Sequence, residues 1–186
     1  MSYTKIILIV LLMNMLVGCA IYDPNRGLFV SSSVQTVTLD LPDKLKQIAI
    51  PYFTFPEHVL SDNQSSTYAV SGVFLPVSHT YGFDDVDKKY LYDSVVTSLI
   101  QSNVEVLSQV ESIPELKISF IKLGMVSAGY KGSVLTISAN LEYIENGISR
   151  NKLTNVTGDA KMTIASSKDH AVKLFLNEIA EFLKNE

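Results

Sequence analysis

Few side chains in this 186-residue sequence have the type and spacing that catalysis or metal binding requires. A helical metal site would have a second histidine three or four residues after the first. None of the three histidines, His58, His79 and His170, has such a neighbour. The acidic residues at positions 84–87 lack the glycine and distal glutamate of a calcium loop, and they suit the positive end of a helix. No serine stands in a Gly-x-Ser-x-Gly motif. We therefore expect a protein that is not an enzyme, with no catalytic residue, cofactor or metal.

The only cysteine, Cys19, follows an N-terminal segment with a pattern of its own. Lys5 makes the start of this segment positive, and residues 6–13 are an unbroken apolar run. The run has the length of a signal-peptide core and falls short of the roughly 20 residues that span a bilayer. A single cysteine also excludes an internal disulfide and a Cys-rich zinc site.

The residues Leu16-Val17-Gly18-Cys19 resemble the lipobox of bacterial lipoproteins. The resemblance implies that residues 1–18 are a removable signal peptide and that Cys19 carries a diacylglycerol as a thioether, with palmitate among its acyl chains. Two or three acyl chains hold a protein stably on a membrane. Ala20 stands where Asp resembles an inner-membrane retention signal, so we expect a lipid anchor in the outer membrane, facing the periplasm. The alternative is a membrane-anchor helix that contains a buried cysteine.

The composition sets the class of the remaining chain. With 47% hydrophobic and 18% charged residues, the chain can form one domain with a core, and it is not intrinsically disordered. The net charge of -4 argues against a nucleic-acid partner, which selects basic surfaces. Residues 19–33 carry proline, glycine and serine without periodicity and are expected to be an acylated tether. Residues 34–186 are expected to be a single periplasmic domain.

The spacing of apolar residues predicts an α+β fold, an antiparallel sheet with two helices packed on one face. Asn146-Gly147 is a strong hairpin signal, because both residues accept the positive φ of a type I′ turn. Ser166 is expected to cap the last helix, and Asn103 to end the first. Helices are predicted near 85–102 and from 166 onward, and strands at 34–41, 45–55, 67–77, 115–126, 133–145 and 148–164.

This order, joined to the lipobox, resembles the YajG group of outer-membrane lipoproteins and, more distantly, the auxiliary lipoproteins of envelope transport systems of the LptE and PqiC type. The likeness covers residues 90–181 and rests on Leu116-Lys-Ile-Ser-Phe-Ile121, on 129–143, and on the opening of the last helix at 166–172. It implies an accessory or partner-binding subunit of an envelope machine for transport, secretion or cell-wall assembly. A lipid- or glycolipid-binding module is the alternative, and a hydrolase is the weakest hypothesis.

An aromatic stretch with few charges predicts where a protein partner binds. Residues 51–83 carry seven Tyr and Phe but only two formal charges, which is the composition of an interface centre. We expect Phe53, Phe55 and Tyr81 to be exposed and to contact the partner. The alternative is that these rings pack under the sheet. A strand edge left open by Pro51 could also accept a strand of the partner.

Overall fold

The computed structural model describes residues 33–56, 77–81, 85–108, 112–127, 133–158 and 164–184. Only the backbone is described at 77–81, 125–127, 133 and 164–166. Cys19, residues 1–32 and the strand expected at 67–77, apart from its last residue, lie outside this set. Among the described helices, none is long and apolar enough to cross a membrane.

Three long antiparallel strands form the main part of the sheet. They are β4 (Glu115–Ser127), β5 (Ser133–Glu145) and β6 (Ile148–Gly158). The predicted turn joins the last two, with φ of 52° at Asn146 and 77° at Gly147. Alternate residues face the core, as the period-2 pattern predicts, with one shift of register after Phe120. The buried apolar residues are Leu116, Ile118, Phe120, Leu123, Leu135, Ile137, Ala139, Leu141, Tyr143 and Val156.

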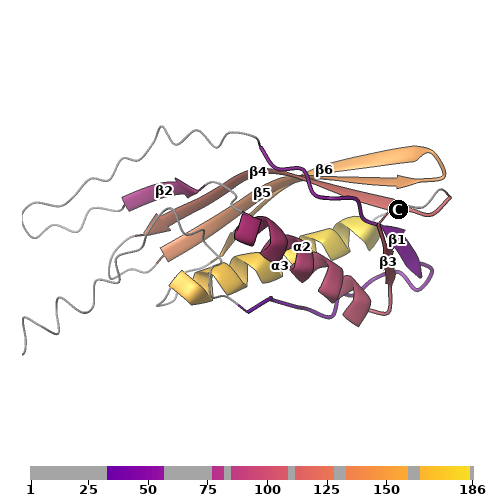
Figure 1. Ribbon diagram of the computed structural model, residues 1–186, viewed down its shortest axis with the longest axis horizontal. Coiled ribbons are helices and arrows are strands. Elements are labelled where there is room, and N and C mark those ends of the chain that lie inside the picture. Colours follow the sequence, from indigo (N-terminus) through magenta and orange to yellow (C-terminus); the bar gives the residue numbers. More distant parts are fainter. Residues whose placement is uncertain are drawn as a thin grey trace, which may run out of the picture.

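Both predicted helices lie on one face of this sheet, α2 (Asp85–Gln101) and α3 (Ile164–Lys184) (Figure 1). The apolar stripe of α3 packs on β5 and β6, and Phe175 at its centre is 1% exposed. Asn103 follows α2 with φ of 63°, so the predicted helix end is confirmed. The predicted cap at Ser166 is wrong, because α3 begins two residues earlier at Ile164.

The sheet is mixed, so the expectation of a purely antiparallel sheet is wrong. Its order is β3-β1-β4-β5-β6, where β1 (Gln47–Ala49) runs parallel to both β3 (Glu105–Leu107) and β4. The chain leaves β1 and returns to β3 through α2, and such a crossover joins parallel strands. A sixth strand, β2 (Val77–Tyr81), pairs antiparallel with the far half of β4.

The two N-terminal strand predictions are largely wrong. Residues 33–46 contain no strand, and only 47–49 of the predicted strand 45–55 enters the sheet as β1. Pro51 cannot donate a ladder hydrogen bond, and the chain then rejoins β4 at Thr54. Its N–H donates to the carbonyl of Ile118 (3.0 Å), and the N–H of Phe120 donates to its carbonyl (2.8 Å). The edge near Pro51 therefore lies against β4.

Candidate functional site

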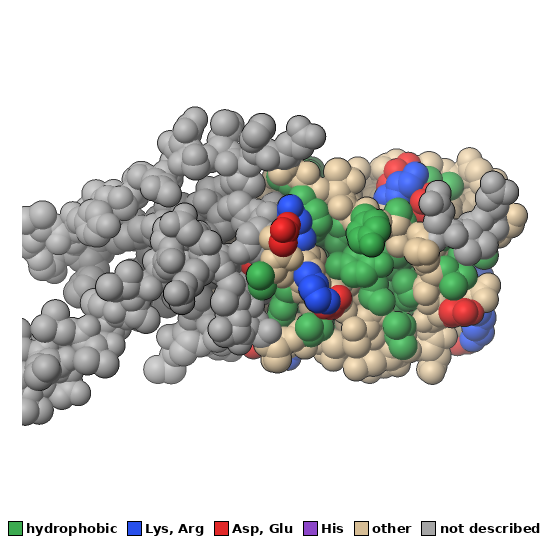
Figure 2. Space-filling view, in the orientation of Figure 1, with side chains coloured by type: hydrophobic (Ala, Val, Ile, Leu, Met, Phe, Trp, Pro, Cys, Tyr) green, Lys and Arg blue, Asp and Glu red, His purple; other side chains and the backbone are tan. Residues whose placement is uncertain are grey.

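A cleft of about 600 Å³ lies between the segment that follows β1 and the first half of α2. We call it the aromatic cleft. Figure 2 shows the face of the molecule that is turned toward the viewer in Figure 1. Hydrophobic side chains gather at the centre of that face, with lysine and acidic side chains beside them. Its size and apolar character are those of sites that bind ligands or anchor side chains of a partner. The residues that line it are Tyr52, Phe53, Phe55, Lys88, Lys89, Tyr92 and Asp93.

The extended backbone after Pro51 decides which rings point into the protein. Successive side chains of an extended segment face opposite sides. Tyr52 is 93% exposed, Phe53 is 7% exposed, and Phe55 is half-buried against the core. Tyr92 is half-buried one helical turn after Lys88 on α2, so it faces the same segment.

The rings form a continuous path from the surface to the core. Tyr52 stacks on Tyr92 with centroids 6.1 Å apart, and Phe53 lies 5.1 Å from Tyr92. Phe53 also lies 5.7 Å from Phe120, which in turn lies 5.4 Å from Phe175. Aromatic contacts at such distances add stability beyond the area they bury. The floor of the cleft is thus held by the core, while Tyr52 covers it from outside.

The charges around the cleft are paired with each other. Lys89 Nζ lies 2.6 Å from the Asp93 carboxylate, and Lys88 Nζ lies 3.3 Å from that of Asp85. Lys88 Nζ also stands 5.9 Å from the centroid of Phe55. These exposed pairs contribute little stability, and they leave the border electrically balanced. The cleft is therefore built for apolar or aromatic groups with hydrogen bonds at the edge rather than for a strongly charged ligand.

The three rings that were predicted to be exposed, Phe53, Phe55 and Tyr81, differ in their positions in the structure. The expected exposure of Phe53 is wrong, because its ring packs between Tyr92 and Phe120. Phe55 is half-buried and lines the cleft. The side chain of Tyr81 lies outside the described atoms, although its backbone pairs with Leu123 on β4.

Sequence reasoning did not single out Tyr52, which is the most exposed ring of the cleft. The exposure of Tyr52 follows from the alternation of side chains along an extended segment: if Phe53 and Phe55 face inward, Tyr52 must face outward. The sequence did not indicate that Tyr92 of α2 lines the cleft, because Tyr92 fits the same apolar period as the buried Val95 and Leu99.

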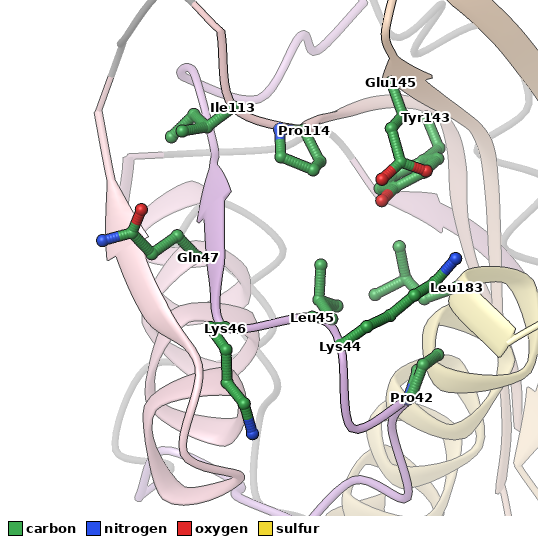
Figure 3. Close-up of a pocket in the computed structure, with 10 residues that line it drawn as sticks. All are labelled: Pro42, Lys44, Leu45, Lys46, Gln47, Ile113, Pro114, Tyr143, Glu145 and Leu183. Atoms are coloured by element: carbon green, nitrogen blue, oxygen red, sulfur yellow. The ribbon is translucent and has the colours of Figure 1, made fainter.

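A second, smaller cleft of about 320 Å³ lies where β1, β5 and the end of α3 meet (Figure 3). Leu45 and Pro114 face its hollow, whereas Lys46 and Gln47 extend outward. Beside it, the Arg150 guanidinium lies 4.9 Å from the ring centroid of Tyr143. Burial, helped by Glu145, raises the pKa of Tyr143 to about 12. This cleft has no exposed aromatic side chain among its described lining residues, so it lacks the anchor that Tyr52 gives the first.

Charged groups are also buried where α2 and α3 begin. Asp87 is fully buried and Lys168 is 8% exposed. Burial lowers the pKa of Lys168, while Asp169 and Asp87 oppose that shift. These groups lie between packed helices rather than in a cleft. Within the described ranges, no group of three or more His, Cys, Asp and Glu residues could hold a metal ion.

The arrangement of strands and helices occurs in another solved protein. A crystal structure of XCC0632 from Xanthomonas campestris, described as a DUF330 protein, matches with a TM-score of 0.50 and 17% identity over 80% of this chain and 91% of that chain. This chain shares the fold of XCC0632. A second structure, of an uncharacterized protein, matches with a TM-score of 0.42 and 14% identity over 81% of this chain and 95% of that one. No family model and no curated protein matches the sequence.

Identity this low shows the fold and carries no function. The expectation of an α+β domain with two helices on one face is confirmed. The resemblance to the YajG group, and to the LptE and PqiC type, remains a prediction.

Proposed function

We propose that this protein is a non-catalytic lipoprotein of the cell envelope that serves as an accessory, partner-binding subunit of a transport, secretion or cell-wall machine. The observation that carries the proposal is the aromatic cleft, where the exposed Tyr52 stands over a floor of rings fixed by the core. Rigid aromatic side chains bind protein partners at low entropic cost, and they dominate the energetics of many interfaces. The balanced charges of Lys88, Lys89, Asp85 and Asp93 favour a protein surface over a nucleic acid.

The proposed anchor is the lipid on Cys19, after removal of residues 1–18, and the proposed location is the periplasmic face of the outer membrane. The lipobox-like Leu16-Val17-Gly18-Cys19 supports both. The chain from Cys19 to Ser33 can extend at most about 50 Å. The described domain could therefore reach a partner in the periplasm while the lipid stays in the bilayer.

The partner is tested by site-specific photo-crosslinking of the full chain in intact cells. A photoreactive residue at position 52 should capture one protein in stoichiometric amounts, and the same residue at Ile100 should not. Ile100 is 55% exposed on α2 but does not line the cleft, so it is a matched control. Equal capture at both positions, or none at 52, would contradict a partner site in the cleft.

The anchor is tested separately, with Cys19→Ser. The wild-type chain should incorporate radioactive palmitate and fractionate with the outer membrane, whereas the variant should stay unprocessed and unlabelled. Palmitate labelling of the variant would rule out Cys19 as the lipid attachment site.

A lipid or glycolipid is the second candidate for the same cleft, because its floor is apolar and its volume suits part of an acyl chain. Native mass spectrometry of the purified full chain distinguishes the two. A bound lipid that Tyr52→Ala and Phe55→Ala remove, together with absence of a crosslinked protein, would favour the lipid.

A further inference from the structure

The strand β6 is the last strand of the sheet that the described residues form, and its outer edge is the side that faces away from β5. In a two-residue hairpin the flanking pair, here Glu145 and Ile148, is doubly hydrogen-bonded, and bonded and non-bonded pairs then alternate. The pairing of β5 with β6 shows no register shift. The odd-numbered residues of β6 therefore direct N–H and C=O away from β5. No other described strand pairs with this edge, which carries Ser149, Asn151, Leu153, Asn155 and Thr157.

This edge lacks the features that usually prevent strands from pairing with another chain. It is 11 residues long and contains no proline. Its only lysine, Lys152, belongs to the even-numbered set and bonds Glu178 on α3 at 2.7 Å. At the centre of the strand, Leu153 is 70% exposed on the face opposite the helices. A long edge with an apolar centre is a template for another strand.

The order of side chains along β6 identifies the other strand. We propose that β6 pairs antiparallel with β6 of a second copy of this chain, centred on Leu153. In that register Leu153 faces its own counterpart, Asn151 faces Asn155, and Ser149 faces Thr157. On the helix side Lys152 faces Thr154, so no like charges lie opposite each other. All five outward residues find partners, which gives about ten backbone hydrogen bonds.

The helices allow this approach. A two-fold axis between two antiparallel strands is perpendicular to the sheet, so both copies carry their helices on the same face. Because α3 packs over β5 and β6, and strands lie about 4.8 Å apart, the two α3 helices would be separated by about 10 Å. That is the ordinary distance between packed helices. The pairing extends the sheet across two subunits and is independent of the aromatic cleft.

Disulfide crosslinking of the full chain in its membrane tests both the contact and its register. Opposed residues of such a pair have Cα atoms about 5.5 Å apart, within the range that a disulfide bridges. Leu153→Cys should form a covalent dimer under mild oxidation. Asn151→Cys and Asn155→Cys should crosslink when expressed together, at least about tenfold more than either alone. Ile121→Cys on β4, 53% exposed, is the control for random collision, and the unmodified chain controls for Cys19.

Two variants test the pairing without an added cysteine. The N–H of Leu153 points away from β5, so Leu153→Pro removes no bond within the subunit but blocks the edge. It should convert a dimer into a monomer in sedimentation of the detergent-solubilised chain, with unchanged circular dichroism. Leu153→Lys should do the same if the proline variant misfolds. A monomeric wild type, a Leu153→Cys crosslink to another protein, or a Leu153→Cys dimer without the 151–155 crosslink would overturn the proposal.

Discussion

Serine hydroxyls supply hydrogen bonds that the backbone of this protein cannot make by itself. Ser98 Oγ accepts the N–H of Val37 at 3.1 Å, and Ser102 Oγ accepts that of Leu39 at 2.6 Å. Ser167 Oγ accepts the N–H of Leu135 at 2.9 Å and donates to the carbonyl of Gly158 at 3.1 Å. A hydroxyl can donate and accept at once, so each serine connects α2 or α3 to a neighbouring segment.

Two tyrosines should make folding depend on pH in strong base. Burial raises the pKa of Tyr90 to about 12, with Asp169 adding to the shift, and the pKa of Tyr143 is also about 12. Since the fold favours the protonated phenol, this stabilisation is complete below pH 10 and is lost as pH rises from 10 to 12. The lowered pKa of Lys168 acts the opposite way, adding stability as pH rises toward 10.5. We expect the net loss above pH 10.5.

Phenolate absorbance during a pH titration measures this directly. Tyr90 and Tyr143 should ionise only near pH 12 or as the protein unfolds. Tyr90→Phe and Tyr143→Phe should each remove one late step. A single titration near pH 10 for all tyrosines would contradict the burial of these two rings.

Gly158 is fixed by close contact between β6 and α3. A Cβ at this position would lie 2.7 Å from the backbone nitrogen of Ala171 and would also meet the carbonyl oxygen of Ser167. Gly158→Ala should therefore lower the free energy of unfolding by about 2–3 kcal/mol in urea denaturation. Gly124→Ala is the control, because its Cβ would meet only the flexible side chain of Lys122 at 3.2 Å, and it should cost less than about 1 kcal/mol. Equal losses would show that α3 does not approach the sheet this closely.

At the scale of elements, the segment at 34–41 shows why a strand prediction can fail. Its β-branched residues favour extended backbone, yet residues 34–41 belong to no strand. Its hydrogen-bond partners are Ser98 on α2 and Ser102 directly after it, and Asp40 is bound by Lys184 Nζ at 2.6 Å. Local sequence predicts conformation, whereas a strand also needs a neighbouring strand, which local sequence does not specify.

Removing these serines should release the segment from α2. Ser98→Ala and Ser102→Ala leave the N–H groups of Val37 and Leu39 without the hydroxyl acceptor, at about 1–2 kcal/mol each after the helix-favouring effect of alanine is subtracted. Hydrogen exchange at Val37 and Leu39 should accelerate in the double variant. Gln101→Ala, on the exposed side of α2, should change neither stability nor exchange. Protected amides in the double variant would mean that other contacts hold the segment.

The parts predicted correctly have long periodic patterns. β4, β5 and α3 each repeat an apolar residue often enough to define a face, and Asn146-Gly147 fixes the hairpin between β5 and β6. β1 and β3 have three residues each, too few for a period, so the parallel pairing was not predictable. The aromatic stretch located the cleft, but contact with β4 decided that Phe53 turns inward. The composition of the aromatic stretch thus indicates where the cleft lies, whereas packing against β4 determines that Tyr52 is the exposed ring.

At the scale of the whole molecule, its two ends differ. The described chain enters beside the start of α2, where the backbone of Gln35 lies close to the Tyr90 side chain. It then runs along the helices to the other end, where Asp40 meets the last turn of α3. The β5–β6 turn lies at that other end as well, since Arg150 stands 5.6 Å from the ring centroid of Phe182. The turn and the smaller cleft therefore lie at the end of the domain opposite to its first described residues (Figure 1).

This arrangement predicts that the domain folds without its anchor, provided that the segment at 33–46 is kept. Residues 33–186 retain Leu39 and Leu45, which are 5% and 8% exposed in the core, as well as the bonds to α2. They should unfold in urea in one cooperative transition and retain near-ultraviolet circular dichroism. A chain that begins at Lys46 loses both leucines, and since a buried leucine contributes about 2–5 kcal/mol, it should be less stable by at least 4 kcal/mol. Equal stability of the two chains would show that the segment is not part of the core. A longer chain without fixed tertiary signals would show that the lipid anchor contributes to folding as well as location.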